Sequence, residues 1–138
     1  MTKSIICAAG IIRRGDRVLI AQRKPDSSLE PLKWEFPGGK IEFSEDPRVC
    51  LVREIREEMD FEIAVDEIFE VVSHNYRKDG ETRHVLLLCY LCTYRGGEPR
   101  PIDCHDMRWV GPAEIGSYDF AAADIPVVAK VLSRLWGR

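Results

Sequence analysis

Apolar and acidic positions are segregated along residues 47–59 with the period of a helix. At about 100° per residue, one side of this helix collects apolar residues and the nearly opposite side collects carboxylates. The apolar positions are Val49, Val52, Ile55 and Met59, and the acidic positions are Glu54, Glu57 and Glu58. Asp46 can cap the helix with its side chain, and Pro47 suits the first helical position. The pattern predicts one core face and one carboxylate face.

Strand-like segments precede this helix. Residues 4–12 and 17–21 are rich in apolar residues that favour strands, and the intervening turn at 13–16 predicts an antiparallel hairpin. Residues 34–37 predict a short extended segment that enters a turn at Gly38 and Gly39.

Further strands and a second helix follow the first helix. Residues 68–76 and 83–94 predict two strands around a turn at 78–80, and residues 107–110 predict a short strand. Apolar residues then recur at helical spacing from Asp124 towards the C-terminus. Helices on both sides of a mixed β-sheet predict an α/β fold, a three-layer α/β/α sandwich.

Composition narrows the class of protein. A length of 138 residues with 45% apolar content suits one domain that spans residues 1–138. The net charge of −3 and the pI near 5.7 argue against a binder of nucleic acid polymers or anionic membranes. The chain lacks both a run of roughly 20 apolar residues and a signal-peptide pattern, so we expect a cytoplasmic location. The five cysteines are odd in number, which suits reduced thiols.

The three glutamates of the carboxylate face suggest a metal site. Like charges one helical turn apart repel one another, and a polyvalent cation removes that penalty. Carboxylate oxygens are the ligands that Mg²⁺ and Mn²⁺ prefer, and Mg²⁺ commonly joins protein carboxylates to substrate phosphates. The alternative is a solvated acidic surface, which is the ordinary role of a charged helix face.

The residues around this cluster favour the metal site, because they resemble the signature of the Nudix hydrolases, G-x5-E-x7-R-E-U-x-E-E-x-G-U, where U is bulky and apolar. Eight of the nine fixed positions match, namely Gly39, Glu45, Arg53, Glu54, Ile55, Glu57, Glu58 and Phe61. Asp60 stands at the ninth position, where the family has glycine. Since Asp adopts the left-handed conformation more readily than most residues, we expect a modest stability cost and no loss of chemistry.

This resemblance implies a Nudix-type fold and roles for the side chains at the signature positions. The metal ligands would be Glu54, Glu57 and Glu58 with the Gly39 carbonyl. Mg²⁺ would be the cofactor, with Mn²⁺ as a substitute, and Arg53 would orient the carboxylates. The general base would be Glu54 or, as second choice, Asp103 in the loop before Trp109. The alternative for Asp103 is a solvated loop residue.

Similarity to the MutT-type branch of this family, and to the CTP pyrophosphohydrolases, extends over almost the whole chain. The similar pieces are residues 10–23, 34–42, 82–87 and 120–132. They imply substrate contacts by Arg23, Phe36, Lys40, Arg83 and Asp124. The alternatives are core packing for Phe36 and surface salt bridges for Arg23 and Arg83.

Asp124 carries the most information about the base. MutT-type enzymes selective for 8-oxo-guanine commonly have asparagine at this position, and an amide both donates and accepts hydrogen bonds. An ionised aspartate only accepts, which suits the cytosine amino group or the N7–H of 8-oxo-guanine. The alternative is that Asp124 is the N-cap of the last helix.

The resemblance therefore implies a Mg²⁺-dependent pyrophosphohydrolase of nucleoside triphosphates, acting on 8-oxo-dGTP or on CTP, dCTP and modified cytosine nucleotides. The expected partner is a small nucleotide, bound by a monomer or a homodimer. Two alternatives stay open at this point. One is a Nudix hydrolase of nucleotide sugars or dinucleotides, and the other is a catalytically silent ligand-binding module with the same fold.

Overall fold

One mixed β-sheet organises the chain, and the computed structural model describes residues 3–137 of it. The strands are β1 (Lys3–Arg14), β2 (Arg17–Gln22), β3 (Trp34–Glu35), β4 (Gly38–Lys40), β5 (Glu62–Lys78), β6 (Glu81–Gly96) and β7 (Asp106–Val110). Their order is β3-β2-β1-β6-β5, with β4 paired to β1 and β7 paired to β2. The β1–β6 pair is parallel and the others are antiparallel. The sheet is therefore mixed, as the sequence predicts.

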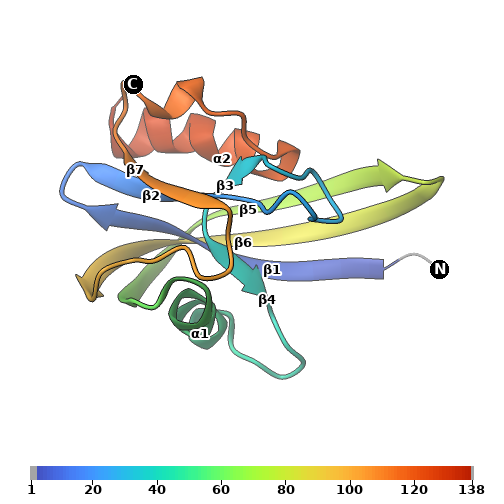
Figure 1. Ribbon diagram of the computed structural model, residues 1–138, viewed down its shortest axis with the longest axis horizontal. Coiled ribbons are helices and arrows are strands. Elements are labelled where there is room, and N and C mark those ends of the chain that lie inside the picture. The colour runs from blue at the N-terminus through green and yellow to red at the C-terminus, as the bar shows by residue number, and fades with distance from the viewer. Residues whose placement is uncertain (1–2, 138) are drawn as a thin grey trace.

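Helices lie on both faces of this sheet (Figure 1). They are α1 (Pro47–Met59) and α2 (Ile125–Lys130), the latter preceded by a 3-10 turn (Ala122–Asp124) and continued by a π-helical turn (Val131–Leu135). Side chains alternate along the strands, so Ile12 and Leu19 pack under α1 while Ile11 and Ile20 pack under α2. This two-sided burial confirms the three-layer α/β/α sandwich. No helix among residues 3–137 is long and apolar enough to cross a membrane.

Helix α1 begins and ends where the sequence predicts. The Asp46 side chain accepts a hydrogen bond from the Arg48 N–H at 2.8 Å, and Pro47 takes the first helical position. Asp60 adopts the left-handed conformation with φ 57° and ψ 44°, and its N–H donates to the Arg56 carbonyl at 3.1 Å. The aspartate therefore ends the helix in the way that a glycine commonly does.

The predicted core face of α1 is confirmed at Ile55 and Met59, which are buried, and was wrong at Val49. Val49 is 60% exposed, whereas Cys50 and Leu51 are fully buried. Cys50 lies under the β4 backbone, with its Sγ 3.5 Å from the Lys40 carbonyl. Because the buried arc is turned towards β4, it includes Glu54, whose side chain is only 13% exposed. The carboxylate face is thus partly turned into the protein. Glu54 is therefore not simply a solvated surface residue.

The Gly38-Gly39 segment is a strand rather than the predicted turn. It forms β4, in which Gly38 pairs with Ala9 and Gly39 pairs with Ala8. A Cβ on Gly38 would lie 1.9 Å from the Ala8 carbonyl oxygen, so only glycine permits this close approach. The strand carries the backbone past α1 and fixes the distance between the sheet and the helix.

Candidate active site

The Glu54 side chain of α1 lies against the backbone of β4 at Gly39. A Cβ built on Gly39 would lie 2.3 Å from the carboxylate carbon of Glu54. The space that a side chain would take at Gly39 is therefore filled by the Glu54 carboxylate. This contact explains why the signature pairs a glycine at position 39 with a glutamate at position 54.

Arg53 links three of the four signature glutamates. Its guanidinium donates to Glu45 at 2.7 and 2.9 Å, to Glu54 at 3.0 Å and to Glu57 at 3.1 Å. The hydrogen bond from Arg53 is the main cause that lowers the pKa of Glu45 to about 2. The predicted orienting role of Arg53 has the contacts that it requires, and Glu57 is the most exposed carboxylate of this set at 61%.

Glu58 adds a second half-buried carboxylate next to Glu54. Burial, followed by the charge of Glu54, raises the pKa of Glu58 to about 9. A cation bound beside Glu58 would favour its ionised form. Asp103 lies beside Glu58, since the Asp103 N–H donates to the Glu58 carbonyl at 3.1 Å. The loop before β7 therefore brings its acidic residue to the same place, as the sequence predicts.

This donor set fits a hard divalent cation. Mg²⁺ takes carboxylate and carbonyl oxygens, and those are the groups that β4 and α1 present together. In the arrangement seen here, no group of three His, Cys, Asp or Glu side chains within residues 3–137 is already closed around a metal position. Arg53 and Lys24 hold some of the carboxylates instead, at 3.0 Å from Glu54 and 2.7 Å from Asp103.

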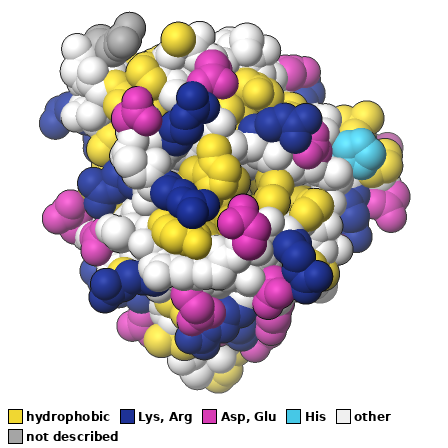
Figure 2. Space-filling model, turned by 60° about the vertical axis from the view of Figure 1, so that its left-hand side comes forward, with side chains coloured by type: hydrophobic (Ala, Val, Ile, Leu, Met, Phe, Trp, Pro, Cys, Tyr) yellow, Lys and Arg dark blue, Asp and Glu magenta, His cyan; other side chains and the backbone are white. Residues whose placement is uncertain are grey.

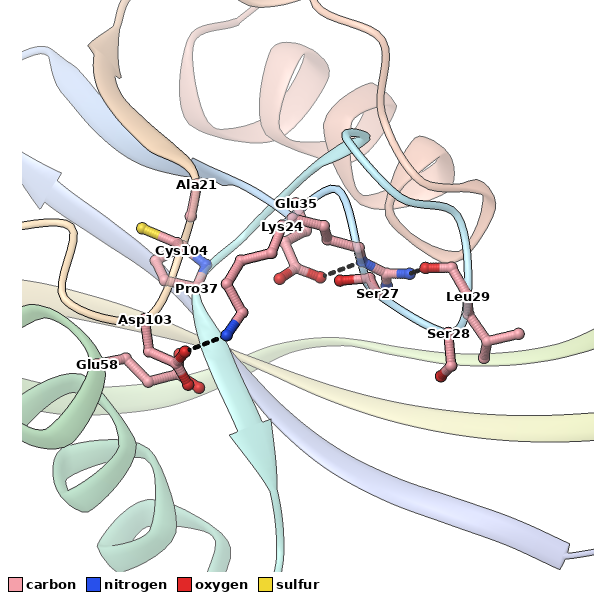
Figure 3. Close-up of a pocket in the computed structure, with 11 residues that line it drawn as sticks. Ala21, Lys24, Ser27, Ser28, Leu29, Glu35, Pro37, Glu58, Asp103 and Cys104 are labelled. Carbon is pink, nitrogen blue, oxygen red and sulfur yellow. Dashed lines mark hydrogen bonds and ion pairs between the residues drawn. The ribbon is translucent and has the colours of Figure 1, made fainter.

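A cleft begins at Glu58 and continues away from α1 as two adjoining cavities of about 300 and 280 Å³. Both cavities are lined by Arg23, Leu29, Glu35 and Glu58. The first also contains Lys24 and Asp103, which Figure 3 shows reaching towards each other. The second is more apolar and extends between the sheet and the turn before α2, where Phe36, Tyr76, Val85, Leu87 and Asp124 line it. The two cavities thus adjoin through four shared lining residues.

Arg23 and Glu35 form an ion pair at the junction of the two cavities. Arg23 Nε donates to Glu35 at 2.8 Å, and its Nη1 donates to the Leu29 carbonyl at 2.8 Å. Burial raises the pKa of the Glu35 carboxyl, and the Arg23 guanidinium opposes that shift. Arg23 therefore lies where the sequence predicts a substrate contact, but in a fixed orientation. Sequence reasoning missed Glu35, although an acid between the aromatic residues Trp34 and Phe36 was a usable signal.

Asp124 is buried in the lining of the second cavity. Its side chain is 3% exposed, and its Oδ1 accepts a hydrogen bond from the Phe36 N–H at 2.9 Å. Asp124 stands at the N-cap position of α2, but the alternative role as a side-chain cap is wrong, because its side chain makes no capping hydrogen bond to that helix. Burial and then the Glu35 carboxylate raise the pKa of Asp124 to about 8. At neutral pH this carboxyl can therefore both donate and accept, whereas the sequence reasoning treated it as an acceptor only.

Replacing Asp124 with Asn should make stability less dependent on pH. The folded protein keeps the Asp124 proton up to about pH 8, whereas an unfolded chain loses it near pH 4. The contribution of this group to stability is complete below the unfolded pKa and decreases as the pH rises through the folded pKa. The free energy of unfolding of Asp124→Asn minus that of the wild type should therefore increase from about pH 4 to about pH 8.

Urea unfolding at about pH 5, 7 and 8.5 measures this difference. Asp119→Asn is the matched control, because the Asp119 side chain is 77% exposed. Parallel pH curves for the wild type and Asp124→Asn would show that Asp124 does not keep its proton in the folded protein.

Phe36 packs in the core, and its contact with a substrate stays a prediction. It is 3% exposed and stacks on Phe120, with 5.8 Å between the ring centroids. It also lines the second cavity, next to Tyr76, whose hydroxyl accepts a hydrogen bond from the Ala123 N–H at 3.1 Å. Tyr76 was missed because only the pairing of distant strands brings it to this cavity.

The structure does not bring Lys40 and Arg83 into the lining of either cavity. Lys40 is exposed at the end of β4, where its carbonyl accepts from Arg53 at 3.4 Å. Arg83 lies on β6 opposite Tyr76. By the alternation of the strand it shares the face of Val85, which does line the second cavity. Substrate contacts by Lys40 and Arg83 stay predictions.

Comparison with known proteins places this geometry in a family. The NUDIX domain model matches residues 3–131. A putative 8-oxo-dGTP diphosphatase 2 of Mycobacterium tuberculosis is 36% identical over 132 residues, covering 96% of this chain and 91% of the relative. A CTP pyrophosphohydrolase of Escherichia coli is 37% identical over 129 residues, covering 91% of this chain and 90% of the relative.

Solved structures agree with the sequence relatives. The solution structure of a MutT protein from methicillin-resistant Staphylococcus aureus aligns with a TM-score of 0.74 at 37% identity, covering 96% of this chain and 98% of that one. The signature, the fold and the relatives therefore lead to one conclusion: the chain belongs to the Nudix hydrolases, in their MutT-type branch.

Proposed function

We propose that this protein is a Mg²⁺-dependent pyrophosphohydrolase of nucleoside triphosphates. As a Nudix hydrolase it acts on phosphoric anhydride bonds, and members of the family generally need a divalent metal. The observation that carries the proposal is the lining of the cleft. Glu58 of α1 lines both cavities, and the second, more apolar cavity is also lined by Phe36 and the buried Asp124.

The dimensions and lining of the cleft support a nucleotide. The second cavity, at about 280 Å³ and bounded by aromatic and aliphatic side chains, suits a nucleobase. The carboxyl of Asp124 offers a donor and an acceptor to the edge of that base. The phosphates then extend towards α1, past Arg23 and Lys24.

The reaction is the attack of water on a phosphorus atom of the triphosphate chain. A divalent ion bound at Glu54, Glu57 and Glu58 would neutralise charge on the phosphate oxygens and lower the pKa of water. Glu54 receives the proton of the attacking water, one P–O–P bond breaks, and the products are the nucleoside monophosphate and pyrophosphate. Arg53 keeps Glu54 and Glu57 in place, since it contacts both. We infer that the whole chain works as one catalytic domain.

The surface agrees with a small substrate rather than a nucleic acid polymer. On the face drawn in Figure 2, basic and acidic side chains are interspersed, and its described residues form no continuous basic stripe. A polymer binder would need such a stripe to neutralise successive phosphates.

The test is kcat/KM for pyrophosphate release with Mg²⁺, compared among 8-oxo-dGTP, dGTP, CTP, dCTP and 5-methyl-dCTP. Recognition through a buried hydrogen bond should separate the bases by about a hundredfold or more. The relatives named above make 8-oxo-dGTP and CTP the first two substrates to compare. Activity that survives removal of divalent ions with EDTA, or release of orthophosphate from every triphosphate, would contradict the proposal.

A further inference from the structure

Lys24 reaches across the mouth of the cleft to the acidic cluster. It follows Arg23 at the end of β2, and its Nζ lies 2.7 Å from Asp103 Oδ1. Asp103 is tied to α1, because its N–H donates to the Glu58 carbonyl at 3.1 Å. Figure 3 shows the Lys24 side chain extended to Asp103 beside Glu58, with all three lining the first cavity. An ammonium group is therefore paired with Asp103 in the cavity that Glu58, an expected metal ligand, also lines.

The neighbouring Arg23 is held very differently. Arg23 has two partners, Glu35 and the Leu29 carbonyl, and its side chain is only 19% exposed. The Lys24 side chain is 48% exposed and that of Asp103 is 55% exposed, and one hydrogen bond joins them. An ion pair this exposed contributes little stability, so a stronger cation can break it. Arg23 is fixed, whereas Lys24 is free to change its partner.

We propose that Lys24 is the internal counter-ion of Asp103 and Glu58, which a divalent cation displaces, and that the displaced ammonium then binds the polyphosphate of the substrate. The second half of this proposal rests on the function proposed above. A divalent ion beside Asp103 repels an ammonium only a few ångströms away. The displaced Lys24 remains in the first cavity with Ser27 and Ser28, whose hydroxyl groups can also bind phosphate oxygens.

The test uses Lys24→Met, which keeps most of the aliphatic stem and removes the charge. Without nucleotide, Mn²⁺ binding followed by electron paramagnetic resonance should tighten about five- to tenfold, because a like charge is removed from the site. In the same variant, KM for the Mg²⁺-nucleotide should rise about tenfold, since one phosphate contact is lost. A loss of structure alone would not move these two values in opposite directions.

Lys33→Met is the matched control. Lys33 forms an ion pair with Asp119 at the same 2.7 Å, but neither residue lines the two cavities of the cleft. This control should keep both the Mn²⁺ affinity and KM of the wild type.

Each result decides one part of the proposal. Unchanged or weaker Mn²⁺ binding by Lys24→Met would overturn the counter-ion role, and an unchanged KM would overturn the phosphate contact. Failure of the wild type to hydrolyse any triphosphate would instead overturn the proposed function, and the Mn²⁺ measurement would still decide the role of Lys24 towards the metal.

Discussion

Replacing Glu54 with Gln should lower kcat by about a hundredfold or more, which is the usual scale for losing one electrostatic group at a reaction centre. Gln has nearly the same shape, so it can keep its contact with Gly39 and accept a hydrogen bond from Arg53. It cannot accept a proton from water, and it is a weaker ligand for a divalent ion. The measurement is steady-state pyrophosphate release with Mg²⁺, together with thermal unfolding to show that the fold is kept.

Glu62→Gln is the matched control for this variant. Glu62 pairs with Arg56 of α1 at 2.6 Å, but it lies outside both cavities and its side chain is 46% exposed. This change should leave kcat near the wild-type value. A Glu54→Gln enzyme with wild-type kcat would exclude Glu54 both as a metal ligand and as the general base.

Local structure could be predicted from the sequence wherever it depends on neighbouring residues. The ends of α1 are the clearest case, because Asp46, Pro47 and Asp60 act within one turn of their own positions. The direction of the buried face was harder to predict. Val49 satisfies the helical period as well as Leu51 does, and only the position of β4 decides which of them is covered.

The site residues also fall into a group that the sequence could predict and a group that it could not. The signature identifies Glu54, Glu57 and Arg53 together because they lie on a single helix. The far cavity depends on contacts between distant segments, such as the bond from the Phe36 N–H to Asp124. Such a contact brings together residues separated by 88 positions, and no local pattern encodes it. The environment of Asp124, and so its protonation, followed only from the folded structure.

Substitutions at the two adjacent glycines of β4 should have different effects, on stability at Gly38 and on catalysis at Gly39. In Gly38→Ala the new Cβ would lie 1.9 Å from the Ala8 carbonyl oxygen and 2.8 Å from the Ala9 Cα, and both are backbone atoms. The β1–β4 pairing would have to move, so we expect a loss of stability of about 3 kcal/mol or more. In Gly39→Ala the new Cβ meets the end of the Glu54 side chain instead, which can rotate away.

Gly39→Ala should therefore fold with nearly wild-type stability and lose about a hundredfold or more in kcat, because a displacement of about 1 Å at a reacting group has that effect. Urea unfolding and kcat, measured on both variants, test the contrast. Gly116→Ala serves as the control, since its Cβ would meet nothing within 4 Å. Wild-type stability in Gly38→Ala would show that β1 and β4 can separate at little cost. An active Gly39→Ala would show that catalysis does not need the Glu54 carboxylate against β4.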